Sequence, residues 1–263
     1  GTALDLQDAG VTIQAIIDLR KNPDYDDIAI TAVKKGMRIE TGQAVYAAQH
    51  QGSMRITSVE VRTLISQGIC SDHGEIIACD LLCMSVGYTP AYQLACQAGA
   101  QLSYDDASAM FTITNCPDKL HLAGSVNSLW ALKDVLSEAT NVAHQVTNEL
   151  GTTDLVLESP IRSSIPSPNH PWPIFAHPEG KEFVDFDEDL TIADIINATG
   201  DGYEHIQLVK RYSTCGMGPS QGRHSALAAA RIVAAATNRT VADTGVTTAR
   251  PPFSAEQLGQ SAG

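Results

Sequence analysis

Apolar residues follow two different patterns along the chain, and the change between them divides it. In the first half, apolar runs at 11–18, 54–64 and 76–86 are separated by glycine-containing turns. A run without polar alternation is typical of a parallel strand buried on both faces, whereas the alternation in 54–64 predicts an antiparallel strand. After residue 181, apolar positions recur every three or four residues, which predicts helices. We therefore expect an α/β part followed by a small helical part.

Glycines and polar caps set the bounds of the other expected elements. Gly10 and Gly36 are placed to end two early helices, and Asp189 or Thr191 to cap a later one. The expected helices cover 2–9, 24–36, 128–149, 190–198, 203–211 and 222–237, and a further short strand covers 120–124. We place the α/β domain at 1–150, a connector at 151–180, the helical domain at 181–250 and the start of a linker at 251–263.

The connector is rich in proline. Six prolines lie between positions 160 and 178, and at that density they exclude helices and central strands. Trp172 and Phe175 interrupt this stretch, and we expect them to anchor it on a surface.

Composition narrows the class of partner. The chain has 263 residues, of which 43% are hydrophobic, and a net charge of -13. An acidic chain repels nucleic acid and anionic lipid, so we expect neither as a partner. The sequence contains no run of about 18 apolar residues, so we expect no membrane span.

The six cysteines show no CxxC spacing. We interpret them as reduced thiols, which indicates a cytoplasmic chain. Cys79 and Cys83 lie in an apolar run and are expected in a strand core, while Cys215 lies in a glycine-rich stretch.

The first candidate site residue is Asp18, which ends the apolar run 11–18. In a dinucleotide-binding βαβ unit, an acid at this place accepts hydrogen bonds from the adenosine ribose. Arg20 is also compatible with a 2′-phosphate. The alternative is a strand that simply ends in a solvated aspartate.

The second candidate is a pair of turns. The turn Gly87-Tyr88-Thr89-Pro90 follows an apolar run, and KLHLAGSV follows about 30 residues later, with Gly124 and Ser125 at its end. This pair resembles the two-dinucleotide-binding-domain flavoproteins of the disulfide reductase type. In that class an acid binds the flavin ribityl chain at the place where Ser125 stands here, so the choice between NAD and FAD stays open.

The third candidate is the stretch VKRYSTCGMGPSQGR. Its glycines let the backbone approach a ligand, its hydroxyls and amide are neutral donors, and its cations stand out in an acidic chain. The residues concerned are Lys210, Arg211, Ser213, Thr214, Gly216, Gly218, Ser220, Gln221 and Arg223. We expect Gly222 to open a helix whose N-terminus favours an anion, such as the phosphate of FMN. Alternatively, the loop only packs one helix against another and its cations are solvated.

The same stretch, together with FVDFDEDLTIADIINATGDGYEHIQL before it and TGVTTARPPFSAEQLG after it, resembles the alpha subunits of heterotetrameric sarcosine oxidases. The match covers essentially the whole chain. It implies a partial two-dinucleotide-binding-domain flavoprotein fold at 1–150, a helical insert, and further domains beyond both ends. It also implies bound NAD, FMN shared with a beta subunit that oxidises the amine, and smaller subunits in the complex.

Relatives in this family that carry a [2Fe-2S] cluster have cysteines near FVDFDEDL and near KRYSTCGMGP. Here only Cys215 lies near either place, and a cluster needs four thiolates, so we expect no iron–sulfur cluster. His177 and His224 have no recognisable ligand spacing, so we expect no metal. We interpret the acidic residues Asp185, Asp187, Glu188 and Asp189 as a solvated helix start. No catalytic set is recognisable.

Two other functions remain open. The helical part could be a subunit-docking module without its own cofactor. A stand-alone pyridine nucleotide–disulfide oxidoreductase would need a redox CxxC and an A-x-G-D motif, and the sequence has neither.

Overall fold

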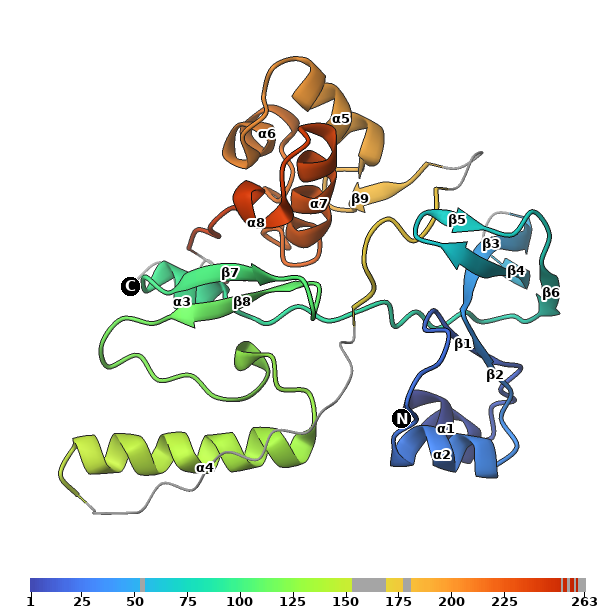
Figure 1. Ribbon diagram of the computed structural model, residues 1–263, viewed down its shortest axis with the longest axis horizontal. Helices are drawn as coiled ribbons and strands as arrows, with labels where there is room; N and C mark the ends of the chain where they lie inside the picture. The colour runs from blue at the N-terminus through green and yellow to red at the C-terminus, as the bar shows by residue number, and fades with distance from the viewer. Residues whose placement is uncertain are drawn as a thin grey trace. The chain divides into compact units, whose positions relative to one another are not determined.

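A computed structural model describes residues 1–52, 55–152, 169–176, 181–251, 253, 254, 256, 257 and 259 (Figure 1). The chain forms two compact units. Unit 1 comprises Gly1–Val86 and His170–Glu179, and unit 2 comprises Gly87–Asn169 and Gly180–Gly263. The predicted domain 1–150 is thus divided between the two units.

Unit 1 begins with two short helices and a parallel strand pair. Helix α1 spans Thr2–Asp8, and α2 spans Asp27–Lys34 with the side chain of Asp26 as its N-cap. Strand β1 (Ile16–Asp18) pairs in parallel with β2 (Ile39–Thr41). The apolar run at 11–18 therefore yields a strand only over its last three residues.

The rest of unit 1 is an antiparallel meander. Strand β4 (Arg55–Ser66) pairs with β3 (Gln43–Gln51), β5 (Ile69–Cys70) and β6 (Glu75–Ala78). The alternation predicted for 54–64 is confirmed, because Val59 and Val61 point into a core with Ile77.

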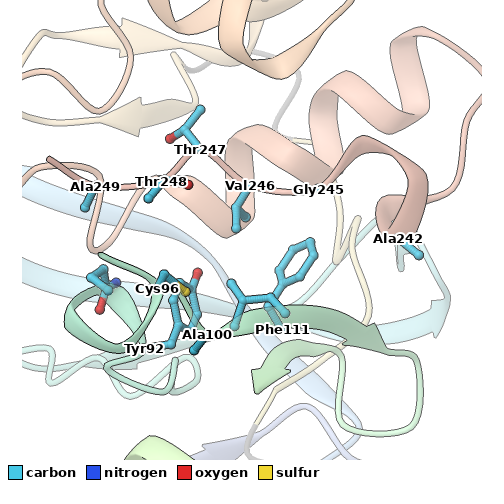
Figure 2. A pocket seen from close by; sticks show the side chains of 12 residues that line it. Tyr92, Cys96, Ala100, Phe111, Ala242, Gly245, Val246, Thr247, Thr248 and Ala249 are labelled. Carbon is cyan, nitrogen blue, oxygen red and sulfur yellow. The ribbon is translucent and has the colours of Figure 1, made fainter. Parts of the chain in front are cut away.

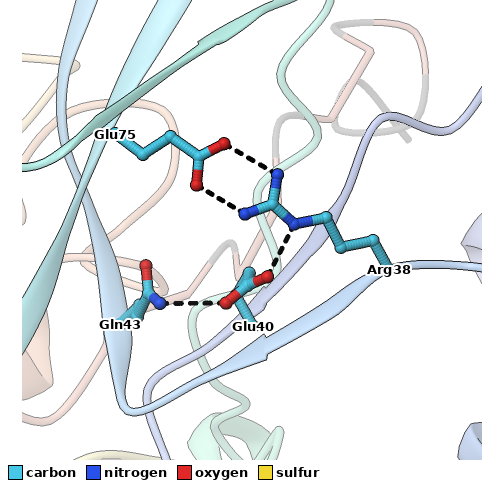
Figure 3. A network of polar contacts seen from close by, with 4 residues as sticks. All are labelled: Arg38, Glu40, Gln43 and Glu75. Carbon is cyan, nitrogen blue, oxygen red and sulfur yellow. Dashed lines mark hydrogen bonds and ion pairs between the residues drawn. The ribbon is translucent and has the colours of Figure 1, made fainter.

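A surface ion-pair network connects three of these strands (Figure 3). Arg38, next to β2, donates to both carboxylate oxygens of Glu75 on β6 and to Glu40 on β2. Gln43 on β3 donates to the other oxygen of Glu40 at 3.0 Å.

The anchoring predicted for Phe175 is confirmed. Its ring stacks on Tyr46 with a centroid distance of 5.1 Å, and its backbone bridges to Gly68. The carbonyl oxygen of Trp172 accepts a hydrogen bond from Gln67. Residues 153–168 and 177–180 of the predicted connector lie outside the described residues.

Two predicted strands are wrong. The run 76–86 is a strand only as far as Ala78, and Leu81, Met84 and Val86 are each at least 60% exposed. Cys83 is exposed as well, although all six cysteines are free as predicted. Residues 120–124 form no strand, and Gly124–Asn127 form a 3₁₀ turn, η1. An apolar run becomes a strand only where a partner strand pairs with it. Among the described residues, β4 pairs with the first run only as far as Ala78, and no strand pairs with residues 120–124.

Unit 2 contains a hairpin and a set of helices. Helix α3 (Gln93–Gln97) precedes the hairpin β7 (Gln101–Asp105) and β8 (Met110–Asn115), and α4 spans Leu132–Glu149. The antiparallel strands β9 (Phe183–Asp185) and β10 (Leu190–Thr191) follow. The helices after them are α5 (Ile192–Gly200), α6 (Ile206–Ser213), α7 (Ala226–Ala236) and α8 (Val241–Thr244).

Helix α7 packs on the hairpin and α3. Ala230 is fully buried against Tyr92 and Phe111, and the alanine-rich face lets the helix approach closely. Arg231 fixes the same contact by donating to the carbonyl oxygen of Ala109 at 2.7 Å. The predicted α/β part followed by a helical part is confirmed.

The carboxylate of Asp18 is expected to make the stability of the fold depend on pH. Burial alone would raise its pKa, but hydrogen bonds from the side chain and N–H of Arg20 outweigh burial and hold the pKa below its ordinary value. A lowered folded-state pKa contributes stability above the unfolded-state pKa, and that stability is lost as the pH falls through the folded-state pKa.

Arg20→Ala should therefore destabilise the chain by about 1 kcal/mol or less at neutral pH, because the guanidinium is half exposed. The urea midpoints of the wild-type and variant chains should converge as the pH falls below about 4. A difference that is constant with pH would contradict this account.

Candidate functional site

The loop between α6 and α7 is built around two close glycines. Gly216 and Gly222 both have φ of 74°, and Thr214 and Gln221 also have positive φ. A Cβ on Gly216 would lie 3.3 Å from the Cα of Gly222. Both the left-handed conformation and the close backbone approach therefore require glycine at these two positions.

Two aspartates from the β9–β10 turn hold this loop. Asp185 is fully buried, and its Oδ2 accepts hydrogen bonds from the N–H of Gly216 (2.7 Å) and the hydroxyl of Ser225 (3.0 Å). Its Oδ1 accepts from the N–H of Asp187 (3.0 Å). The Asp187 carboxylate in turn accepts from the N–H of Ser220 at 2.8 Å.

The interpretation of Asp185 as part of a solvated acidic cluster is therefore wrong. Its buried charge is stabilised by three donors, two of them from residues 31 and 40 positions away. Asp187, Glu188 and Asp189 are exposed, as expected.

Local contacts also shift the pKa values of Asp187 and Cys215. The hydroxyl and N–H of Ser220, and more weakly His224 and Arg223, lower the pKa of Asp187. Burial and the neighbouring Asp185 raise the pKa of the Cys215 thiol to about 11. At neutral pH a thiol with this pKa is protonated.

Most of the predicted phosphate donors of the loop already have partners among the described residues. Besides the N–H groups of Gly216 and Ser220, the Ser213 hydroxyl donates to Val209 O and the Thr214 hydroxyl to Glu188. The Gln221 amide donates to Gly218 O at 3.1 Å. Two carboxylates of the chain thus bind two of the N–H groups that the sequence offered to an external anion.

The predicted helix start is also displaced. Helix α7 begins at Ala226, so Gly222 does not open it. The positive φ values of Gln221 and Gly222 are incompatible with an α-helix, whose residues all have negative φ.

The predicted cations have different surroundings. Lys210 is half buried on α6, and burial together with Arg250 and Arg211 lowers its pKa. Within the described ranges, neither Lys210 nor Arg211 has an ion-pair partner. Arg223 donates through Nε to Ser220 O, and its guanidinium lies 5.0 Å from the ring centroid of Phe253. Lys210, Arg211 and Arg250, called here the cationic group, are therefore available to an anion.

The fold also brings together Asp185, Asp187 and His224, whose ligand atoms lie within 4.8 Å of one another. The sequence analysis missed this grouping because His224 is 37 residues or more from the aspartates. Their hydrogen bonds to the loop account for both carboxylates, so the expectation of no metal stays a prediction.

In unit 2, each of the two turns predicted to approach a nucleotide has its own contacts. Tyr88, beside Gly87, stacks on Trp130 at a centroid distance of 5.1 Å, and Asn169 bonds to both backbone groups of Tyr88. Gly124 is buried, and its N–H donates to Glu138 on α4 at 2.6 Å. Ser125 follows in the turn η1.

In unit 1, Asp18 lies at the end of β1, as predicted. Its two carboxylate oxygens bind Arg20. A ribose hydroxyl would have to share the carboxylate with that guanidinium.

Residues 179–263 match the sarcosine oxidase A3 domain family. The whole chain is similar to the sarcosine oxidase subunit alpha of Rhizobium meliloti, with 31% identity over 99% of this chain. Its identity to the sarcosine oxidase subunit alpha of Corynebacterium sp. strain U-96 is 28% over 95% of this chain. The chain spans 25% and 26% of the lengths of these two relatives.

The fold is similar to that of L-proline dehydrogenase from P. horikoshii, with a TM-score of 0.68 and 17% identity. That similarity covers 98% of this chain and 52% of the other. None of the helices in the described ranges combines the length and apolar character needed to cross a bilayer.

Almost the whole chain is thus similar to part of sarcosine oxidase alpha subunits, and residues 179–263 match the A3 domain of that family.

Proposed function

We propose that this chain is a cofactor-binding portion of the alpha subunit of a secondary-amine oxidoreductase of the sarcosine oxidase type. The observation that carries the proposal is the similarity of 95–99% of the chain to sarcosine oxidase alpha subunits. In this proposal the chain binds cofactors and does not itself oxidise the amine. That step takes place on a beta subunit, and smaller subunits complete the complex.

The dinucleotide of the proposal is NAD, with FAD as the alternative. In unit 1 the candidate ribose ligand is Asp18, and in unit 2 the candidate positions of close backbone approach to a nucleotide are Gly87, Gly124 and Ser125. The N–H of Gly124 now donates to Glu138, so a phosphate at that N–H has to displace a carboxylate. The ring of Tyr88 in the first turn stacks on Trp130, which follows the second turn in sequence, and this contact supports a site near these turns.

The second cofactor of the proposal is FMN, shared with the beta subunit. Because Asp185 and Asp187 occupy the loop's N–H groups, the phosphate is bound by side-chain charge instead. Lys210 and Arg211 provide that charge, and Arg223 is a further candidate. A flavin supplies the two-electron acceptor for amine oxidation.

A subunit-docking module without its own cofactor is the second candidate. It is favoured by the internally satisfied loop and by exposed apolar side chains on the helical part. These side chains are Ile196, Tyr203, Leu208, Tyr212 and Met217. A stand-alone disulfide-type oxidoreductase is disfavoured by the absence of CxxC.

Replacing Lys210 with glutamine in a complex with the beta subunit is expected to weaken FMN retention by roughly tenfold, about 1.4 kcal/mol. Lys210 is the cleanest position for this test, because no described residue forms an ion pair with its ammonium group. Arg223→Ala should also weaken retention, but it removes the bond to Ser220 as well.

The matched control is Arg239→Gln, which removes a cation of the same unit that already pairs with Glu204. Flavin content and subunit co-elution are measured on the same sample. Full flavin content with lost subunit association in Lys210→Gln would reject the phosphate role and favour the docking module.

A further inference from the structure

A cavity of about 250 Å³ in unit 2 has no group whose charge changes near neutral pH (Figure 2). None of its twelve lining residues is Asp, Glu, Lys, Arg or His. Burial raises the pKa of the Tyr92 hydroxyl and of the Cys96 thiol, so both keep their protons. A group that does change its charge in this range lies elsewhere in unit 2, at the start of α6.

The side chain of His205 caps the N-terminus of α6. Its Nδ1 lies 3.2 Å from the backbone nitrogen of Gln207. A backbone N–H can only donate, so this ring nitrogen is the acceptor and carries no proton. The first N–H groups of a helix have no acceptor within the helix, and the His205 ring supplies one for α6.

An imidazole cap differs from the caps of two other helices in this chain. Helices α2 and α8 are capped by side-chain oxygens of Asp26 and Thr240. Imidazole is the side chain whose charge ordinarily changes between about pH 5 and 8. A protonated ring carries N–H on both nitrogens and cannot accept a hydrogen bond. Its positive charge is also unfavourable next to the positive end of the helix dipole.

No nearby acid is placed to stabilise a protonated His205. Among the residues that the structure describes, no carboxylate lies within ion-pair distance of the ring. The neighbouring acids in the sequence have other partners, since Asp201 accepts from the Tyr212 hydroxyl at 2.7 Å and Glu204 pairs with Arg239. The first turn of α6 contains no acidic residue. Arg239, which follows α7, brings a further positive charge to Glu204.

We propose that His205 makes the start of α6 sensitive to pH, so that the turn is closed with a neutral ring and opens when the ring gains a proton. Helix α6 has eight residues, and a helix of two turns depends strongly on its cap. Lys210 and Arg211 lie in its last turn, so loosening α6 also weakens the binding of FMN at acidic pH. That last step rests on the proposed function, whereas the cap itself does not.

Amide hydrogen exchange of the 263-residue chain, followed by NMR at about pH 7.5 and 5.5, tests this proposal. Each rate is expressed as protection relative to an unfolded chain at the same pH. Protection of the N–H groups of Gln207, Leu208 and Val209 should fall about fivefold at the lower pH, as befits a lost cap. The N–H groups of α5, which starts at the capping box of Thr191 and Asp194, should keep their protection.

Three variants attribute the effect to the ring. His205→Asn keeps an acceptor that does not titrate, because asparagine is a preferred N-cap, so protection of α6 should be equal at the two pH values. His205→Ala has no acceptor, and its α6 should be as poorly protected at the higher pH as the wild-type helix is at the lower. The matched control is His224→Asn, which removes an exposed imidazole of the same unit, outside the cap of α7. It should keep the fivefold effect.

An equal fall of protection in His205→Asn and the wild type would overturn the proposal. So would constant protection in the wild type, or wild-type protection of α6 in His205→Ala at the higher pH. These measurements contain no cofactor, so their failure leaves the FMN site untouched. Unchanged flavin retention in Lys210→Gln would, in turn, leave the cap as it stands.

Discussion

Replacing Asp185 with alanine is expected to lower the free energy of unfolding of unit 2 by about 3–5 kcal/mol. The carboxylate is fully buried and accepts from Gly216, Ser225 and Asp187. Its removal leaves the buried Gly216 N–H and Ser225 hydroxyl without their acceptor. Each such group costs about 1–3 kcal/mol, and the loss of packing adds to this.

Urea denaturation followed by circular dichroism measures this effect. Asp185→Asn should cost less, because its amide oxygen can still accept from one of the donors. Asp187→Ala is the matched control, since Asp187 is exposed and accepts from Ser220 alone among the described backbone groups, so about 1 kcal/mol is expected. If Asp185→Ala costs no more than Asp187→Ala, the buried carboxylate does not hold the loop.

Elements with strong local patterns could be predicted from the sequence. Helix α5 begins at a capping box in which Thr191 and Asp194 bond to each other, as the Thr/Asp pattern indicates. The long alternation of β4 fixed its position almost to the residue. In each of these cases the deciding interactions are a few residues apart or repeat along the element.

Elements that depend on distant partners could not be predicted. The run around Leu81 and Met84 is as apolar as a buried strand, but no described strand pairs with it and both side chains are exposed. The hairpin β7–β8 was missed, although Asp105 supplies the turn with bonds to the N–H groups of Ala107 and Ser108. An aspartate that accepts from the next residues is a turn pattern that the sequence did offer.

The candidate site was also predictable only in part, for the same reason. The glycines and cations of the loop were recognisable by residue type, and Gly216 does adopt the conformation that glycine allows. The identity of the anion inside the loop was not recognisable. Asp185 and its partners Gly216 and Ser225 meet only through the packing of β9 against the loop, and four acidic residues within positions 185–189 suggested solvent instead.

Gly218→Ala should be the second most damaging change in this region, at about 2–3 kcal/mol. Gly218 has no positive φ, so backbone strain does not explain the need for glycine. The reason is space, because a Cβ here would lie 2.9 Å from both Cγ and Oδ2 of Asp187 and closer still to its Cβ. Asp187 cannot withdraw without breaking its hydrogen bond to Ser220.

Gly200→Ala is the matched control, because the Cβ of that variant meets nothing within 4 Å at the end of α5. It should change stability by less than about 1 kcal/mol and in the stabilising direction, since alanine restricts the unfolded chain. The double variant Asp187→Gly with Gly218→Ala tests whether the steric clash with Asp187 causes the destabilisation. Asp187→Gly removes the atoms that the new methyl meets, so Gly218→Ala should cost much less in that background than in the wild type. Equal costs in the two backgrounds, measured by urea denaturation, would mean that the contact with Asp187 is not what excludes a side chain at position 218.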